Sequence, residues 1–182
     1  MRFASAAGAF ALLFLVGCHG PGPYGHAPNY VELDEEARAT AGARDYDPVM
    51  VLRQPEEWRK GTVSLFGVVD SRQAGPAGQA LLRLTVRRLA TRNLCDSRTD
   101  EDSCRVTVSD KDFGVVYALV TLKGDDDIGP NAARQRSLVR VVGTIAQEVS
   151  QADGTPIVHA TYYRHWPSLT YVTTEAARDM RQ

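Results

Sequence analysis

Four side chains in the second half of the sequence have the chemistry for catalysis or cross-linking: His159, His165, Cys95 and Cys104. The two histidines are six residues apart in a segment expected to be a strand, which puts them on one face but about 20 Å apart. That separation excludes two ligands of one metal ion. No G-x-S-x-G or H-E-x-x-H motif accompanies them. We therefore expect two surface histidines, no catalytic residue, no metal and no cofactor, with a hydrolase using His159 or His165 as the alternative.

The first 18 residues have the organisation of an export signal. Arg2 precedes an uncharged run over residues 3–16, which is shorter than the ~20 residues of a membrane-spanning helix. The last two residues of the run begin the sequence L-V-G-C at residues 15–18, which resembles the bacterial lipobox. That resemblance implies a signal peptide over residues 1–17 and acylation, palmitate included, at Cys18. An uncleaved anchor or an ordinary secretory signal is the alternative.

The residues after the lipobox indicate a destination and a tether. His19 stands where aspartate retains lipoproteins in the inner membrane, so the resemblance implies the outer membrane, with the chain facing the periplasm. Residues 18–54 are predicted to be a Gly/Pro-rich tether followed by a short helix. Residues 55–172 are predicted to form the folded domain and 173–182 a short C-terminal helix.

Cys95 and Cys104 bracket an acidic loop. With Cys18 acylated, two thiols remain in an oxidising compartment, and their proximity in the sequence predicts a disulfide. A pair of metal ligands is the alternative, although no second pair supports a zinc site. The acidic clusters lack the spacing of a calcium loop, and whether they bind calcium stays open.

Hydrophobic residues alternate with polar ones in five segments from Thr62 onward. In residues 80–90, for example, leucines and valine are expected to point inward and Arg83, Thr85 and Arg87 outward. Gly67 and Gly143 occupy matching places in two of these segments, where a small barrel needs a bend or a close backbone approach. We predict an all-β fold, a five-stranded OB-like Greek-key barrel with short peripheral helices. A small sandwich is the alternative.

Arg83, Arg87 and Arg140 are the candidate partner-binding residues, because all three are expected on the outer surface of the strands. Outward arginines beside aromatic residues would suit a nucleic-acid-binding OB-fold. The chain has 21 basic and 22 acidic residues, however, and an exported protein meets little nucleic acid. The prediction is therefore no nucleic-acid partner, with an OB-fold nucleic-acid binder kept as a remote alternative.

Two segments resemble the Slp-type outer-membrane lipoproteins: QPEEWRKGTVSLFGVVD at residues 54–70 and DIGPNAARQRSLVRVVGTIAQE at residues 127–148. The resemblance covers about half of the mature chain, and the cysteine-bracketed loop departs from it. It implies a lipid-anchored envelope protein and supplies no catalytic residues. We therefore expect a non-enzymatic binding or envelope-maintenance role, with an envelope protein or an anionic glycan as the partner. The alternative is a periplasmic hydrolase.

Overall fold

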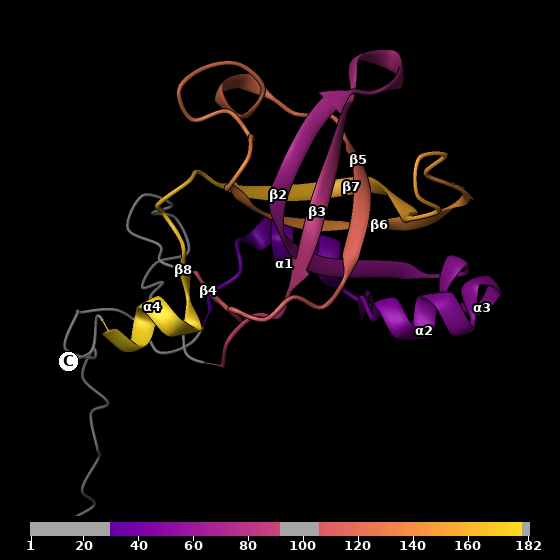
Figure 1. Ribbon diagram of the computed structural model, residues 1–182, viewed down its shortest axis with the longest axis horizontal. Helices are drawn as coiled ribbons and strands as arrows, with labels where there is room; N and C mark the ends of the chain where they lie inside the picture. The colour runs from indigo at the N-terminus through magenta and orange to yellow at the C-terminus, as the bar shows by residue number, and fades with distance from the viewer. Residues whose placement is uncertain (1–29, 92–105, 180–182) are drawn as a thin grey trace, which may run out of the picture.

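Five long strands form a closed barrel in the computed structural model, which describes residues 30–91 and 106–179 (Figure 1). The strands are β2 (Thr62–Ala74), β3 (Ala80–Arg87), β5 (Val115–Val120), β6 (Leu138–Val149) and β7 (Pro156–Trp166). The order β2-β3-β5-β7-β6 closes on itself because β2 also pairs with β6. The β5–β7 pair is parallel, and the other pairs are antiparallel. The predicted all-β, OB-like barrel is confirmed.

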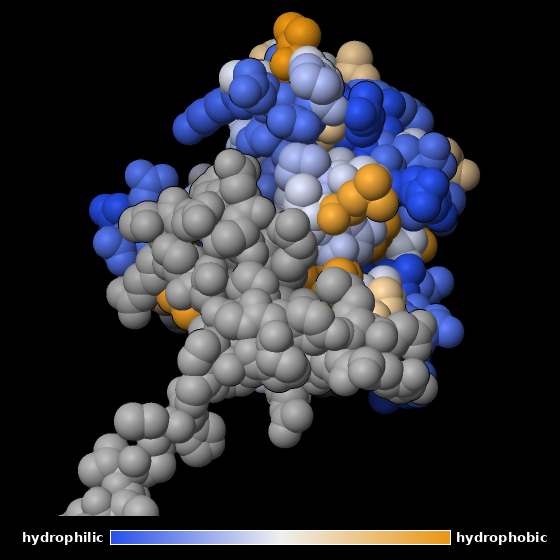
Figure 2. Space-filling model, turned by 90° about the vertical axis from the view of Figure 1, so that its left-hand side faces the viewer, coloured by the Kyte–Doolittle hydropathy of each residue, from blue (hydrophilic) through white to orange (hydrophobic). Residues whose placement is uncertain are grey.

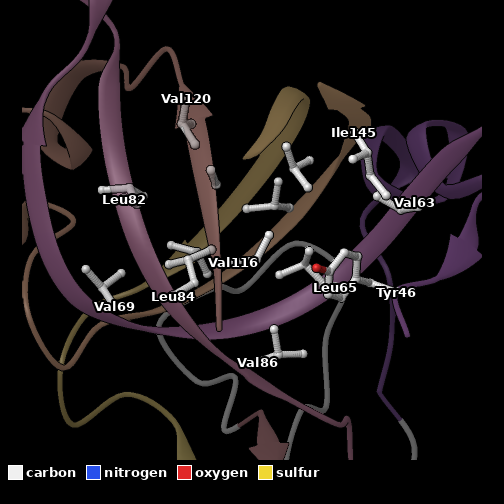
Figure 3. Close-up of a cluster of buried hydrophobic side chains, with 14 of the residues drawn as sticks. Tyr46, Val63, Leu65, Val69, Leu82, Leu84, Val86, Val116, Val120 and Ile145 are labelled. Atoms are coloured by element: carbon white, nitrogen blue, oxygen red, sulfur yellow. The ribbon is translucent and has the colours of Figure 1, made fainter. Parts of the chain in front are cut away.

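The barrel core follows from the alternation of apolar and polar residues along each strand. On β3, Leu82, Leu84 and Val86 are buried, whereas Arg83 and Thr85 between them are partly exposed on the outer surface. Figure 3 shows these side chains in one cluster with valines and a leucine of β2 and valines of β5, while Ile145 of β6 joins the cluster next to Val63. Burial of this shared apolar surface is the main favourable term that holds the five strands together.

Gly143 lies where β6 comes closest to β7. The register shifts between the pairs Val142↔Tyr162 and Gly143↔Ala160, so Thr161 is an extra residue in β7, a β-bulge. A Cβ atom on Gly143 would lie 2.0 Å from the carbonyl oxygen of His159. The expectation that Gly143 marks a close backbone approach in the barrel is confirmed.

The β5–β6 connection closes one end of the barrel. It contains the 3-10 turn η2 (Gly124–Asp126), and Ala133 from the same connection is fully buried in the core. Arg72 of β2 ties the connection down by an ion pair with Asp127 and a 2.8 Å hydrogen bond to the carbonyl of the same residue.

Short elements surround the barrel. They are α1 (Asp34–Thr40), β1 (Arg44–Asp45), α2 (Pro48–Arg53), α3 (Pro55–Arg59), η1 (Pro76–Gly78), β4 (Thr107–Val108), β8 (Val172–Thr173) and α4 (Thr174–Asp179). The short helix expected within residues 18–54 and the short C-terminal helix are present as α1 and α4, and Trp58 of α3 packs into the core. The structure adds β1 and α2 from within residues 18–54.

A second apolar cluster lies outside the barrel wall. Trp166 and Leu138 of the barrel pack there with Val108 of β4 and Val106 beside it.

Hydrophilic side chains predominate over the described part of the face in Figure 2, and hydrophobic ones occur in small separate groups. No helix in residues 30–91 and 106–179 is long and apolar enough to cross a membrane.

Candidate functional site

Arg140 is buried, so the prediction that it is a surface residue available to a partner is wrong. Its alternation with Val139 and Val141 does point it away from the barrel interior, but it is only 7 % exposed. Its Nη1 lies 2.6 Å from Glu32 Oε1 and 2.7 Å from Glu36 Oε1. Its Nε donates to Ser64 Oγ at 3.2 Å. The two glutamates precede or lie within α1, which covers this part of the outer wall.

Glu36 is the centre of this buried network. It is fully buried, and its second carboxylate oxygen lies 2.8 Å from Nη1 of Arg164 on β7. The Tyr30 hydroxyl also donates to Glu36, and burial together with the Glu36 charge raises the pKa of Tyr30 above its usual value. We call Tyr30, Glu32, Glu36, Arg140 and Arg164 the charged clasp. It fastens α1 to β6 and β7.

A signal for the clasp was present in the sequence. Arg140 and Arg164 pair directly across β6 and β7, and like charges placed opposite one another require counter-charges. Glu32 and Glu36 are four residues apart, the spacing that puts two side chains on one side of a helical turn. To predict that the two glutamates neutralise the two arginines, one must know that Arg140 lies opposite Arg164, and the sequence alone does not give that strand register.

Arg83 and Arg87 lie on the outer surface of β3, as predicted, but both are bound to carboxylates. Arg83 Nη1 lies 2.6 Å from Asp70 Oδ2, and Arg87 Nη1 lies 2.7 Å from Asp112 Oδ1. Phe66 of β2 pairs in register with both Arg87 and Arg140. Arg87 and Arg140 therefore come together around Phe66, whereas Arg83 is farther along β3.

Arg87 and Arg140 line a pocket at one mouth of the barrel, with a volume of about 450 Å³. The pocket forms because β1 and β3 pair with the same edge of β2, β1 at Val63 and Ser64 and β3 from Phe66 onward. We call it the mouth pocket. Its lining comes from three stretches and two single residues: Asp45–Pro48, Ser64–Phe66, Val86–Leu89, Phe113 and Arg140.

The mouth pocket combines aromatic walls with arginine. The guanidinium of Arg88, an exposed residue, lies 4.4 Å from the centre of the Phe113 ring, and that of Arg140 lies 5.0 Å from the Phe66 ring. Tyr46 is 8 % exposed, and burial raises the pKa of its hydroxyl to about 12. Figure 3 shows this hydroxyl turned toward the barrel interior. The hydroxyl is therefore neutral and able to donate at physiological pH.

His165 is enclosed, so the prediction of a surface histidine is wrong for this residue. Its side chain is 1 % exposed, and its Nδ1 lies 2.7 Å from Asp126 Oδ1. The Tyr163 hydroxyl donates to the other oxygen of Asp126 at 2.9 Å. His165 points inward because of the bulge at Thr161. The extra residue reverses the alternation, so every later side chain of β7 lies on the opposite face from the one that strict alternation gives.

His159 precedes the bulge and remains on the outer surface. Its side chain is half exposed, 3.5 Å from Glu148. The two histidines therefore lie on opposite faces, against the prediction of one shared face. A groove of about 440 Å³ runs along β7 between α1 and the end of β5, and Asp126 and His165 are among its lining residues. The imidazole of His165 is nevertheless shielded from solvent.

The Asp126–His165 pair gives the fold an acid-sensitive contact. Burial alone would raise the pKa of Asp126, but the hydrogen bond from His165, its charge and the Tyr163 hydroxyl lower it overall below 3.8. A carboxyl group whose pKa is lowered in the folded state stabilises the fold at pH values above its unfolded-state pKa. That stabilisation is lost as the pH falls through the folded-state pKa.

Asp126→Asn should therefore flatten the decline in unfolding free energy between about pH 5 and pH 2. The exposed neighbour change Asp125→Asn should leave the decline as in wild type, as measured by denaturant melts.

Three predicted site residues lie outside the described residues: Cys18, Cys95 and Cys104. The lipidation and the disulfide therefore remain predictions. Within residues 30–91 and 106–179, no three His, Cys, Asp or Glu side chains gather in a group that could hold a metal ion.

No protein-family model matches the chain, and no curated protein matches it. Among solved structures, the protein PriB from Ralstonia solanacearum matches 58 % of this chain and 97 % of its own, with 14 % identity and a TM-score of 0.28. A deletion mutant of the single-stranded DNA binding protein from Thermus aquaticus matches 59 % of this chain with 20 % identity and a TM-score of 0.30. This chain spans about half of that protein, 51 %.

The prediction that excluded nucleic acid as a partner is corrected. A single-stranded DNA binding protein is among the structures that this chain matches. The exclusion rested partly on net charge, and a total over the whole chain does not report a local site. The mouth pocket places Arg87, Arg88 and Arg140 beside aromatic rings in a chain whose charges nearly cancel.

Proposed function

We propose that this chain is a bacterial outer-membrane lipoprotein of the Slp type, held by acyl chains on Cys18, whose OB-like barrel binds a ligand and catalyses no reaction. The lipobox-like residues 15–18 and the Gly/Pro-rich segment after them support the anchor. The observation that carries the binding role is the mouth pocket, with its volume of about 450 Å³.

The positions of the two histidines argue against hydrolysis, and the open mouth pocket favours ligand binding. A general base must reach the proton that it abstracts. The imidazole of His165 is shielded and bonded to Asp126, and His159 is an exposed side chain beside Glu148. The mouth pocket is open and lined by rings and guanidinium groups, which suit recognition of a ligand.

The charged clasp supports a role for the barrel close to a membrane. Residues 18–29 separate the proposed lipid from Tyr30, the first residue of the clasp. Because the clasp fastens this point of the chain to β6 and β7, residues 18–29 would be the part of the chain that connects the lipid to the barrel wall. The ligand pocket would then stay at a limited distance from the bilayer.

Cys18→Ser should abolish acylation and with it delivery to the outer membrane. Serine offers no thiol for the diacylglycerol, and the lipoprotein peptidase requires the modified cysteine. Fractionation should find the wild-type chain in the outer membrane and the variant as an uncleaved precursor. A Cys95→Ser/Cys104→Ser double variant is the matched control and should fractionate like wild type. Equal distribution of wild type and Cys18→Ser would remove the lipid anchor from the account.

Single-stranded nucleic acid is the second candidate ligand, and the arginine–aromatic lining of the mouth pocket favours it. Guanidinium groups can contact phosphates while rings stack on bases. Fluorescence anisotropy with a labelled oligothymidylate tests it in the full chain. Binding that weakens with salt, and that Arg88→Gln weakens further, would support this candidate. Absence of binding at low salt would remove it.

A further inference from the structure

Helix α2 presents an apolar face to solvent. Four of the six residues of Pro48–Arg53 are valine, methionine or leucine. Val51 is 3 % exposed and packs in the barrel core, whereas Val49 is 53 % and Leu52 71 % exposed. Val49 and Leu52 are three residues apart, so their side chains are neighbours on one side of the helix. The helix therefore has more apolar surface than the barrel covers.

Contacts at the start and in the middle of α2 hold this face outward. Oδ1 of Asp47 accepts hydrogen bonds from Val49 N at 2.9 Å and from Met50 N at 3.0 Å, which caps the helix. Met50 packs against the same core as Val51. The helix cannot turn Val49 or Leu52 toward the barrel without taking Val51 out of the core.

The start of α2 and the first described residue of the chain both lie next to the mouth pocket. Pro48 lines the pocket together with Phe66, and the Tyr30 ring lies 5.7 Å from the Phe66 ring. The β5–β6 connection is at the other end of the barrel, because β5 begins beside Phe113 of the pocket and ends at that connection. Figure 1 shows α2 and α3 well apart from the connection.

A bilayer that holds acylated Cys18 lies within reach of this end of the barrel. Residues 18–29 precede Tyr30, and twelve residues span at most about 40 Å when fully extended. A tethered surface meets its target at high effective concentration, so a small contact area is sufficient. Arg53 follows Leu52, is exposed, and has no carboxylate partner in the part of the chain that the structure describes. Its guanidinium group suits the phosphates of lipid headgroups.

We propose that α2 rests on the phospholipid surface of the membrane that holds the anchor. Val49 and Leu52 insert at the boundary between headgroups and acyl chains, and Arg53 contacts lipid phosphates. The contact orients the barrel, with the mouth pocket toward the bilayer and the β5–β6 connection away from it. This inference rests on the proposed lipid anchor and adds an orientation to the point of attachment.

Tryptophan introduced on α2 tests the contact. Leu52→Trp and Val49→Trp are made separately in the full acylated chain, which is reconstituted into phospholipid vesicles with or without bromine on the acyl chains near the headgroup. Wild type supplies the background from Trp58 and Trp166, which are both buried. We expect brominated lipid to quench the added fluorescence of each variant at least about twofold.

Ile128→Trp is the matched control for Leu52→Trp. Ile128 is 79 % exposed and belongs to the β5–β6 connection at the other end of the barrel, so its substitute should not be quenched. Adding Leu52→Asp to Val49→Trp should remove most of the quenching, because a carboxylate resists transfer out of water. Adding Ile128→Asp to Val49→Trp should leave the quenching unchanged.

Two results with an acylated chain would overturn the proposal and leave the anchor in place. One is a Leu52→Trp variant that is quenched no more than Ile128→Trp. The other is an indole in Leu52→Trp that is shielded from aqueous iodide but not quenched by brominated lipid, which would place another protein molecule on this face. A wild-type chain without acyl groups, detected by its intact mass, would instead remove the anchor and the orientation with it.

Discussion

Glu36→Gln should lower the free energy of unfolding by about 3 kcal/mol or more, because it removes the buried carboxylate that two buried arginines share. Glu36 is fully buried and contacts both Arg140 and Arg164, which are themselves less than one tenth exposed. Glutamine has nearly the same shape, so the loss reports charge and not volume. Denaturant melts of the full chain measure it.

The control for Glu36→Gln is the same change at the neighbouring residue. Glu35→Gln removes the same charge from an exposed position of α1 and should change the unfolding free energy by less than about 0.5 kcal/mol. Replacing Glu36, Arg140 and Arg164 together by Leu, Met and Met should recover much of the loss, since apolar groups of similar volume can substitute for a buried ion network. A Glu36→Gln variant as stable as Glu35→Gln would mean that α1 is not seated on the barrel in solution.

Gly143→Ala should destabilise the barrel by about 3 kcal/mol or more. The added Cβ would lie 2.0 Å from the carbonyl oxygen of His159 and 2.9 Å from the Cα of Ala160, so the backbone of β7 must move. No side-chain rotation can relieve a contact between two backbones. Denaturant melts and thermal midpoints check the effect.

Gly61→Ala is the matched control for this change. A Cβ on Gly61 would meet only the side chain of Arg44, at 3.8 Å, which is ordinary contact. We expect a change of less than about 0.5 kcal/mol. A neutral Gly143→Ala would contradict the close approach of β6 to β7 and with it the closure of the barrel at this bulge.

The barrel was predictable because its strands alternate regularly. The inward leucines of β3 and the glycines at Gly67 and Gly143 are local signals. The leucines are buried, and other parts of the chain approach both glycines closely, as the sequence indicated. Burial of Arg140 was not predictable in the same way. Its counter-charges on Glu32 and Glu36 are more than one hundred residues away in the chain.

The position of His165 depended on one residue. Strict alternation along residues 156–166 puts His165 on the same face as His159, and the extra residue Thr161 moves it to the opposite face, where it meets Asp126. Nothing in the local sequence separates a bulge from a continuous strand here. The mouth pocket was equally hidden, because five separate parts of the chain contribute to its lining.

The intact mass of the wild-type chain extracted from the membrane fraction tests the central claim most directly. The account predicts a chain that begins at Cys18 and carries the mass of a diacylglycerol and an amide-linked acyl chain. A chain without lipid, or one that retains Met1, would contradict it.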